Sequence, residues 1–254
     1  MSETILITIP FSHFCEKSRW MLDLTGIPYR EDGHLPVLHR RATRRFGGSS
    51  VPLLATEGQV LKDSSDIAAW VDSHHRIIPT SPDQRADALA LEDGFDTVLG
   101  PHLRRVMYFH LLKSKPALLA MLATCPKSQA RLARFIMPVF KRFLRWSMKL
   151  TSDGTERSLA KVRATFDAVS SRLADARPYL GGDTLTVADL TFAALASPIL
   201  MPPEHPIAWP DDAVLPPAVI ALRAELRQTP AGAFCMRLYR DHRRTSAASP
   251  GVGA

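Results

Sequence analysis

Thr4-Ile5-Leu6-Ile7-Thr8-Ile9, followed closely by Ser12-His13-Phe14-Cys15, is the stretch of sequence that decides the fold. The apolar run predicts a buried strand, and a helical pattern from about Glu16 to Leu24 follows it. A strand that leads into a helix N-terminus gathers free backbone N–H groups and a partial positive charge. Such a site stabilises an anion, and a thiolate is an anion. Because Ser12-x-x-Cys15 is a Cys-x-x-Cys spacing with oxygen in place of the first sulfur, it indicates a protein that acts on the thiol of another molecule.

The composition is that of an ordinary soluble globular protein, with 254 residues of which 46% are hydrophobic and 22% charged. No apolar stretch reaches the roughly 18 residues needed to span a bilayer, and the polar-flanked start predicts no signal peptide. The three cysteines are an odd number at wide spacing, which argues against a disulfide framework. They predict a reducing, cytoplasmic setting.

Positive charge is concentrated in the middle of the chain. Residues 1–80 add nothing to the formal net charge of +7, because nine Lys/Arg balance nine Asp/Glu there. Residues 97–152 hold eleven Lys/Arg and no carboxylate. One interpretation is a pair of amphipathic helices with solvated basic faces. Nucleic-acid binding has the charge but no recognisable motif. A membrane surface is a further alternative, although we expect the interleaved aromatic residues to be core: Phe135, Phe140, Phe143 and Trp146.

Up to about residue 76 the chain alternates strand and helix, in the order βαβ and then ββα. This order predicts a small mixed sheet with helices packed on it. The boundaries are marked by a helix stop at Gly26-Ile27-Pro28 and a hairpin turn at Glu57-Gly58. After the first strand and helix, the expected elements are strands at 29–31, 51–55 and 60–61 and helices at 36–45 and from residue 67 onward.

The rest of the chain shows no convincing strand. We expect a first domain over residues 1–77, a linker at 78–83, an all-helical domain over 84–240 and a disordered tail at 245–254. Within the second domain, Pro138 should kink one helix, Ser197-Pro198 should end another, and the Pro-rich 201–217 should be irregular. The expected helices are 85–112, one that carries the apolar positions of 132–144, 156–176, 186–196 and, as the last clear one, 218–227.

Two further motifs belong with Ser12. Val51-Pro52 opens a strand, where a proline is out of place unless its peptide bond is a cis turn with a role. Asp63-Ser64 caps a helix and so forms a second anion-binding N-terminus. A small tripeptide with two carboxylates and a thiol could use all three sites, with its backbone at Val51, a terminal carboxylate at Ser64 and its thiol at Ser12.

These N-terminal motifs resemble those of the cytosolic glutathione transferases. Residues 12–20 look like the first-helix signature of that family, and 26–29 like the turn that follows it. Residues 51–54 are similar to its cis-proline strand. Residues 63–67 are similar to the acidic-Ser element that grips the γ-glutamyl group of glutathione.

The C-terminal half adds an independent match, because residues 179–190 look like the N-capping box and hydrophobic staple of the same family. Thr186 is the expected N-cap, and Asp189, three residues on, can reach back to its backbone N–H. Leu185 can pack on Leu190 across the cap. The motifs follow the family's order over residues 4–200.

The resemblance implies a glutathione transferase-like fold: a thioredoxin-like α+β N-terminal domain (βαβ-ββα) followed by an all-α domain with a hydrophobic-substrate pocket. It also implies a homodimer and glutathione as co-substrate, and we expect no metal. Alignment with Cys-type members puts Ser12, not Cys15, at the active position. A hydroxyl that donates to the glutathione sulfur favours the thiolate, which then attacks an electrophilic carbon. Cys15 is expected to be a small buried residue, and it stays the rival for the reactive group.

The candidate site residues follow from these matches. Ser12 and Cys15 are the catalytic candidates. The candidates for binding glutathione are His13, Phe14, His39, Val51, Pro52, Asp63 and Ser64. In the family the helices that correspond to the basic stretch wall the second-substrate pocket, where cations favour a hydrophobic electrophile that carries an anionic group. The candidates there are Arg104, Arg105, Tyr108 and His110.

Three functions stay open. The first is glutathione transfer to a hydrophobic electrophile, in a cytoplasmic detoxification role. The second is a Cys15-dependent thiol-redox or glutathione-lyase enzyme, in which a thiol would form mixed disulfides. The third is a non-catalytic binding or scaffold protein. We expect no nucleic-acid partner and no membrane association.

Overall fold

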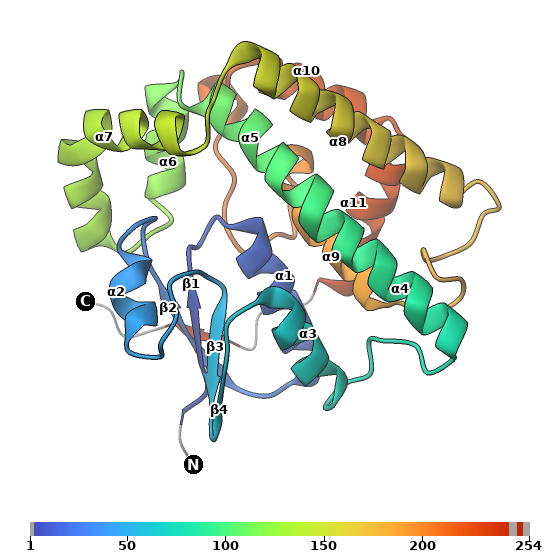
Figure 1. Cartoon of the computed structure of the whole chain (residues 1–254). Coiled ribbons are helices and arrows are strands. Elements are labelled where there is room, and N and C mark those ends of the chain that lie inside the picture. The colour runs from blue at the N-terminus through green and yellow to red at the C-terminus, as the bar shows by residue number, and fades with distance from the viewer. Residues whose placement is uncertain (1–2, 244–247, 251–254) are drawn as a thin grey trace.

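The computed structural model describes residues 3–243 and 248–250, and it consists of a small sheet flanked by a large helical body (Figure 1). The sheet has the strand order β4-β3-β1-β2-β5. Strand β1 is parallel to β2 and antiparallel to β3, which pairs with β4. The N-terminal elements are β1 (Ile5–Thr8), α1 (His13–Thr25), β2 (Tyr29–Gly33), α2 (His39–Arg44), β3 (Leu53–Thr56), β4 (Gln59–Leu61) and α3 (Ser64–Asp72). The predicted thioredoxin-like βαβ-ββα order is confirmed.

Helix α1 is bounded by a capping residue at each end. Ser12 is its N-cap, with an extended backbone and a side chain that accepts from the backbone N–H of Cys15. Gly26 is its C-cap at φ 67°, in the left-handed region that a glycine adopts without a steric penalty.

A fifth strand was not predicted. Strand β5 (Ala248–Pro250) pairs in parallel with β2, whose outer edge would otherwise offer unpaired backbone groups. The prediction of a disordered tail over 245–254 is therefore wrong for 248–250. The remainder of that tail, 245–247 and 251–254, lies outside the described residues.

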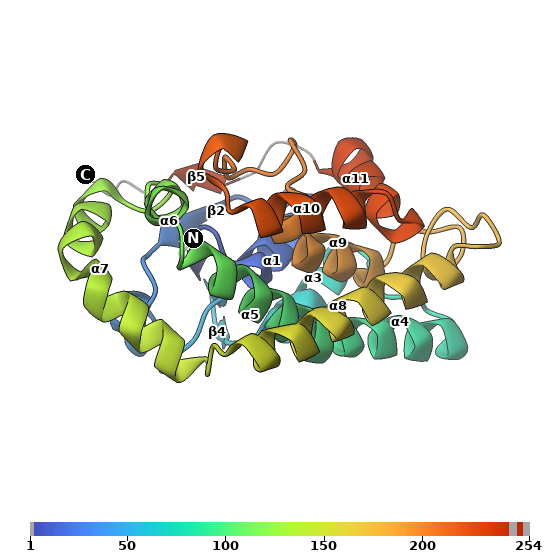
Figure 2. The same cartoon turned by 90° about the horizontal axis from the view of Figure 1, so that it is seen from above.

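The helical part is built around the buried α9, which lies between α1 on one side and α11 on the other (Figure 2). The elements after α3 are α4 (Pro82–Gly94), a π-helical turn (Phe95–Leu99), α5 (Gly100–Leu111), α6 (Lys115–Leu122), α7 (Lys127–Ser147), α8 (Ser152–Arg172), α9 (Val187–Leu200), a 3₁₀ turn (Asp212–Val214), α10 (Pro217–Arg227) and α11 (Pro230–His242). The predicted all-helical second part is confirmed for residues 82–242, and α6 and α11 are additions to the predicted helices.

The predicted helix over 85–112 is interrupted by the π turn. The backbone N–H of Gly100 donates to Phe95 O, five residues back. Gly100 also allows a close approach, since a Cβ there would lie 2.6 Å from the ring of Phe14 on α1. The absent side chain therefore lets the start of α1 pack directly against α5.

Helix α9 continues through Pro198 to Leu200, so the prediction that Ser197-Pro198 ends it is wrong. Proline cannot donate to the carbonyl of Ala194, four residues back. The hydroxyl of Ser197 donates to that carbonyl at 2.9 Å instead. At its other end α9 has the predicted capping box, with Asp189 Oδ2 accepting from the backbone N–H of Thr186 at 2.7 Å.

One hydrophobic core joins the two parts of the molecule. It includes Leu6 and Trp20 from the N-terminal part together with Phe166 and Phe192 from the helical part, all fully buried. A buried ion network crosses the same boundary. Glu16 of α1 accepts from Arg19 at 2.8 Å and from Arg243, just after α11, at 2.7 Å.

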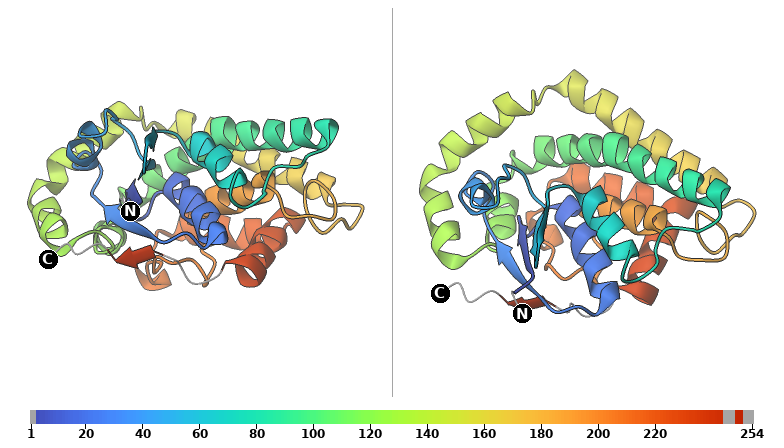
Figure 3. Two further views of the ribbon diagram at one scale, coloured as in Figure 1. Left: turned by 90° about the horizontal axis from the view of Figure 1, so that it is seen from below. Right: turned by 60° about the horizontal axis from the view of Figure 1, so that its bottom comes forward.

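Helix α7 lies at the periphery of the molecule (Figure 3). The prediction that its aromatic residues are core is wrong for two of them, because Phe143 is 40% exposed and Trp146 is 77% exposed. The side chains of Phe135 and Phe140 lie outside the described residues. Across the parts of the chain that the structure describes, no helix is both long and apolar enough to cross a bilayer.

Candidate active site

The register of the sheet brings the first two motifs together. Ile7 lies opposite Leu53 in the antiparallel pair of β1 and β3. The carboxyl end of β1 therefore meets the start of β3, so the chain that leads into Ser12 runs beside Val51-Pro52. The Val51–Pro52 peptide bond is cis, as predicted.

The N-terminus of α3 joins the same edge through shared carboxylates. The fully buried Lys17 of α1 contacts Asp96 at 2.6 Å and also Glu92. From α3, Ser65 donates to Glu92 at 2.6 Å, and Ser64 lies 3.5 Å from Asp96. Burial raises the pKa of Asp96 to about 6, although Lys17 opposes that rise. The two helix N-termini are therefore held next to each other by one buried polar cluster.

Asp63 caps α3 as predicted, because its Oδ1 accepts from the backbone N–H of Ser65 at 2.9 Å. Ser64 is 3% exposed, whereas Asp63 is exposed. The first turn of α3 thus presents backbone N–H groups at a polar edge, which is an environment that favours a carboxylate.

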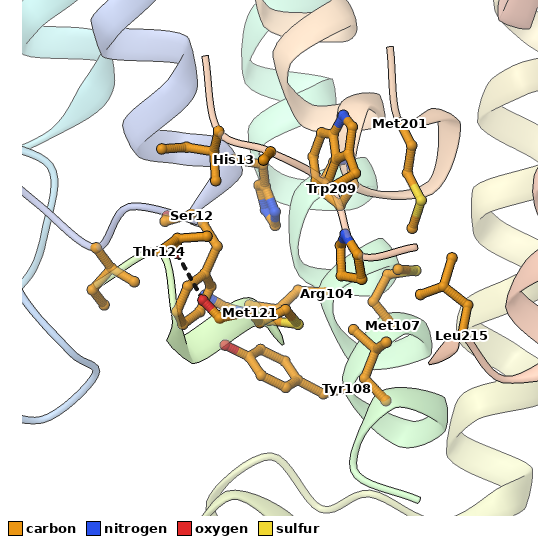
Figure 4. Close-up of a pocket in the computed structure, with 17 residues that line it drawn as sticks. Ser12, His13, Arg104, Met107, Tyr108, Met121, Thr124, Met201, Trp209 and Leu215 are labelled. Carbon is orange, nitrogen blue, oxygen red and sulfur yellow. Dashed lines mark hydrogen bonds between the residues drawn. The ribbon is translucent and has the colours of Figure 1, made fainter. Parts of the chain in front are cut away.

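A cavity of about 130 Å³ opens beside Ser12, between α1, α5, α6 and the segment after α9 (Figure 4). Its wall is mostly apolar. The lining residues are Ile9, Phe11, Ser12, His13, Arg104, Met107, Tyr108, Leu111, Met121, Thr124, Pro198, Met201, Ile207, Ala208, Trp209, Pro210 and Leu215. An apolar cavity with a few polar groups is the usual form of a small-molecule site.

Ser12 lines this cavity and is half-buried. Its Oγ lies 3.5 Å from the backbone nitrogen of Cys15 and acts as the acceptor there. A hydroxyl that accepts in this way keeps its own proton available for donation.

Cys15 is fully buried on the inner side of α1. Burial raises the pKa of its thiol to about 11, even though Arg19 lies close enough to oppose the shift. Reactive cysteines are accessible and have a lowered pKa. The expectation that Cys15 is a small buried residue is confirmed.

His13 and Arg104 are the strongest polar features of the cavity besides Ser12. His13 is 6% exposed, its ring points into the cavity (Figure 4), and its Nε2 finds no hydrogen-bond partner within the described residues. Burial and then the charge of Arg104 lower its pKa to about 3, so the imidazole is neutral at physiological pH. Arg104 is exposed, and no ion pair to it occurs in the described parts of the chain.

Of the four residues predicted for the second-substrate pocket, two line the cavity and two do not. Arg104 and Tyr108 line it, and burial raises the pKa of the Tyr108 hydroxyl to about 12. Arg105 instead turns toward α8 and donates to Ser158 at 3.3 Å. His110 packs edge-on against Phe109, with ring centroids 5.2 Å apart. Placing Arg105 and His110 in this pocket is a wrong prediction, since they lie on other faces of α5.

Of the seven predicted glutathione-binding residues, only His13 lines this cavity. Val51, Pro52, Asp63 and Ser64 belong to the sheet edge and the α3 N-terminus described above, and Phe14 and His39 lie elsewhere. Phe14 packs against Gly100, and this contact fixes the start of α1 beside α5. His39 begins α2 and is half-buried, with burial lowering its pKa.

Sequence reasoning missed the wall opposite Ser12. Trp209 supplies much of it, held by a hydrogen bond from its Nε1 to Pro202 O at 2.8 Å and by the His205 ring at 4.3 Å. The five methionine and leucine residues that line the cavity are Met107, Leu111, Met121, Met201 and Leu215. No group of three His, Cys, Asp or Glu side chains within residues 3–243 is arranged to hold a metal.

Comparison with protein-family models gives two matches in chain order. Residues 6–85 match the glutathione S-transferase N-terminal domain, and residues 152–227 match the glutathione S-transferase C-terminal domain. A comparison with curated protein sequences gives no match.

Solved structures of this fold cover nearly the whole chain. A glutathione S-transferase of Ceriporiopsis subvermispora in complex with glutathione is 17% identical, with a TM-score of 0.65 over 95% of this chain and 98% of its own. The beta-etherase LigF of Sphingobium sp. strain SYK-6 is 14% identical, with a TM-score of 0.59 over 93% of this chain and 99% of its own. A theta class glutathione S-transferase of Xanthomonas axonopodis pv. citri with glutathione bound is 18% identical, with a TM-score of 0.53 over 93% of this chain and 98% of its own. Together with the fold, the two family matches show that the chain belongs to the glutathione S-transferase family.

Proposed function

We propose that this protein activates the thiol of glutathione through Ser12 and transfers it to a hydrophobic electrophile that carries an anionic group. The observation that carries the proposal is the position of Ser12, which lies at the N-terminus of α1 and on the wall of an apolar cavity. The edge that carries Val51-Pro52 and the first turn of α3 would hold the tripeptide, and the apolar cavity would hold the electrophile. The Ser12 hydroxyl lies where the two would react.

Ser12 acts by hydrogen bonding to sulfur. Its hydroxyl proton donates to the sulfur, and the N-terminus of α1 adds a partial positive charge, so both favour the thiolate. The thiol proton passes to solvent water. The thiolate electron pair then forms a carbon–sulfur bond, and the leaving group departs with the electron pair of the bond that breaks.

The other ends of glutathione are assigned to the polar edge. The backbone of its cysteinyl residue pairs with Val51 beside the cis bond, and its γ-glutamyl carboxylate accepts from the first turn of α3 at Asp63 and Ser64. The arrangement is supported by the sheet register and by the buried cluster that joins α1 to α3.

The electrophile is assigned to the cavity because of the side chains that form the cavity wall. Apolar side chains favour a hydrophobic body. Arg104 adds a cation whose charge is neutralised by no carboxylate among the lining residues. The neutral His13 adds one hydrogen-bonding nitrogen. A carboxylate or sulfonate on the electrophile would pair with Arg104 and accept from His13 in the tautomer that carries hydrogen on Nε2.

Arg104→Gln should lower kcat/KM for a carboxylate-bearing aryl electrophile by about tenfold, because a hydrogen-bonded charge contact is lost. The same substitution should leave kcat/KM unchanged for the neutral methyl ester of that electrophile. Arg105→Gln is the matched control, since Arg105 is the next residue in the sequence and its side chain faces α8. Equal losses for the acid and the ester, or an equal effect of Arg105→Gln, would show that Arg104 does not select the anion.

The Cys15-dependent alternative predicts a reactive thiol. We expect instead that iodoacetamide leaves Cys15 unmodified in the folded protein at neutral pH and alkylates it after unfolding in urea, because the thiol is buried and its pKa is about 11. Mass spectrometry of the peptide that contains Cys15 measures this. Rapid alkylation of the folded protein would restore the thiol-redox alternative.

The scaffold alternative predicts neither retention on immobilised glutathione nor thiolate absorbance when glutathione is added. Retention together with thiolate absorbance would exclude it. Retention without the absorbance would leave a glutathione-binding protein that does not activate the thiol.

A further inference from the structure

Helix α7 exposes four large apolar side chains along one face. The exposed fractions of its apolar side chains are 47% for Leu132, 72% for Val139, 40% for Phe143 and 77% for Trp146. These positions are separated by 7, 4 and 3 residues. On an α-helix, residues at such intervals lie within about 60° of one another around the axis. The four side chains therefore form one stripe that faces away from the protein.

This stripe is not the face that holds α7 to the body. Among the side chains of the helix that the structure describes, Met137 and Leu144 are the buried ones, and they belong to one hydrophobic cluster with Leu118 and Leu122 of α6. Near its start, Gln129 also accepts from the backbone N–H of Leu35 at 2.9 Å. Since the helix already has a separate packing face, its exposed stripe is available for a partner.

Basic side chains border the stripe on one side. Lys141, Arg142 and Arg145 surround Pro138 and Trp146 in a shallow surface groove. No ion pair to any of these three cations occurs in the described parts of the chain. No carboxylate occurs anywhere in residues 97–152 either, so no acidic neighbour in the sequence neutralises them.

We propose that this face of α7 binds the surface of an anionic phospholipid bilayer. A strongly amphipathic helix with Trp, Phe and Leu on one face and Lys/Arg beside it is the chemistry of a helix that lies in the plane of the membrane interface. The apolar stripe would enter the boundary between headgroups and acyl chains. Arg142 and Arg145 would contact lipid phosphates, and Trp146 would lie at the headgroup level.

The charge and the apolar stripe of α7 disfavour the two alternative partners, a second copy of this chain and nucleic acid. Two copies of this chain that met through α7 would bring two carboxylate-free basic surfaces together, which is unfavourable. Nucleic acid would satisfy the cations but would leave the apolar stripe without a partner. An anionic bilayer satisfies both at once. The proposal also concerns a part of the chain that neither family model matches, because those matches end at residue 85 and resume at residue 152.

The test is co-sedimentation of the full-length protein with phosphatidylcholine vesicles and with vesicles that contain phosphatidylglycerol as well. We expect binding only to the anionic vesicles, weakened by added salt, together with a blue shift of Trp fluorescence. Arg142→Glu/Arg145→Glu should lower the partition coefficient by at least about tenfold, because two cations that the anionic surface attracts are replaced by carboxylates that it repels. Trp146→Ala should weaken binding and remove the fluorescence shift.

The matched control is Arg76→Glu/Arg85→Glu, which changes the net charge equally at exposed positions away from α7. It should retain vesicle binding, and all three variants should retain far-UV circular dichroism and glutathione-conjugating activity. The proposal is overturned if the unmodified protein ignores anionic vesicles or if the control loses binding as much as Arg142→Glu/Arg145→Glu. It is also overturned if Trp146→Ala and Arg142→Glu/Arg145→Glu alter only the oligomeric state, or only binding to duplex DNA. Because conjugation is assayed separately, failure here leaves the proposed transferase function intact.

Discussion

Ser12→Ala is expected to lower kcat/KM for glutathione conjugation on the order of 100-fold, because removal of one donor to a developing or stabilised anion costs about that much. The loss should be accompanied by disappearance of the thiolate absorbance of bound glutathione at neutral pH. A stopped-flow titration of that absorbance against pH measures the shift of the glutathione pKa toward its value in solution.

Two variants separate chemistry from folding in this experiment. Ser12 is also an N-cap, so its loss costs about 1 kcal/mol of stability. Thr151→Ala removes a comparable cap, in which Oγ1 accepts from Gly154 N at 3.1 Å on the remote α8, and it should leave kcat/KM unchanged. Cys15→Ala should retain most of the activity. An inactive Cys15→Ala beside an active Ser12→Ala would reverse the assignment of the two residues.

Glu16→Gln is expected to lower the free energy of unfolding by about 3 to 5 kcal/mol, since it removes one partner from a buried ion network. Glu16 is fully buried, and its carboxylate contacts Arg19 and Arg243, which are almost fully buried as well. Urea unfolding followed by circular dichroism measures the loss. Glu225→Gln is the matched control, because its ion pair with Arg163 is exposed and such pairs contribute at most about 1 kcal/mol.

The same network predicts a pH dependence with a definite sign. Burial alone would raise the pKa of Glu16, but Arg243, His205 and Arg19 outweigh burial and lower it to about 2. The unfolded chain therefore binds a proton near pH 4.5 that the folded protein takes up only near pH 2. The stabilisation is complete above pH 4.5 and declines as the pH falls toward 2, so the difference between the unmodified protein and Glu16→Gln should shrink over that interval. A constant difference down to pH 2 would contradict the role given to the Glu16 charge.

Most of the N-terminal fold could be predicted because its signals are local. The apolar run before Ser12, the glycine at 26 and the capping residue at 63 each act within a few residues of themselves, as does the capping residue at 186 in the helical part. Helix α11 was missed although Phe234, Cys235 and Leu238 have helical spacing. Thr229-Pro230 reads as the end of α10, whereas Thr229 caps the next helix and Pro230 is its first residue.

In the candidate site, too, the features set by local sequence could be predicted and those set by long-range packing could not. The positions of Ser12 and Ser64 follow from helix starts, but the cavity wall depends on long-range packing. Arg104 and Arg105 are neighbours about 100° apart around α5, and only the placement of α8 decides which of them faces the cavity. Trp209 lies in a Pro-rich stretch with no periodicity to indicate its direction. The homodimer and the cytoplasmic location stay predictions.

The ion pair between Glu16 and Arg243 joins residues 227 positions apart in the sequence. A ribosome synthesises α1 well before Arg243, and domains made early generally begin to fold while later ones are still being synthesised. Until Arg243 has emerged, the Glu16 carboxylate has only Arg19 of its two arginine partners. The final packing of α1 against the helical part therefore has to wait until the chain has been synthesised as far as Arg243.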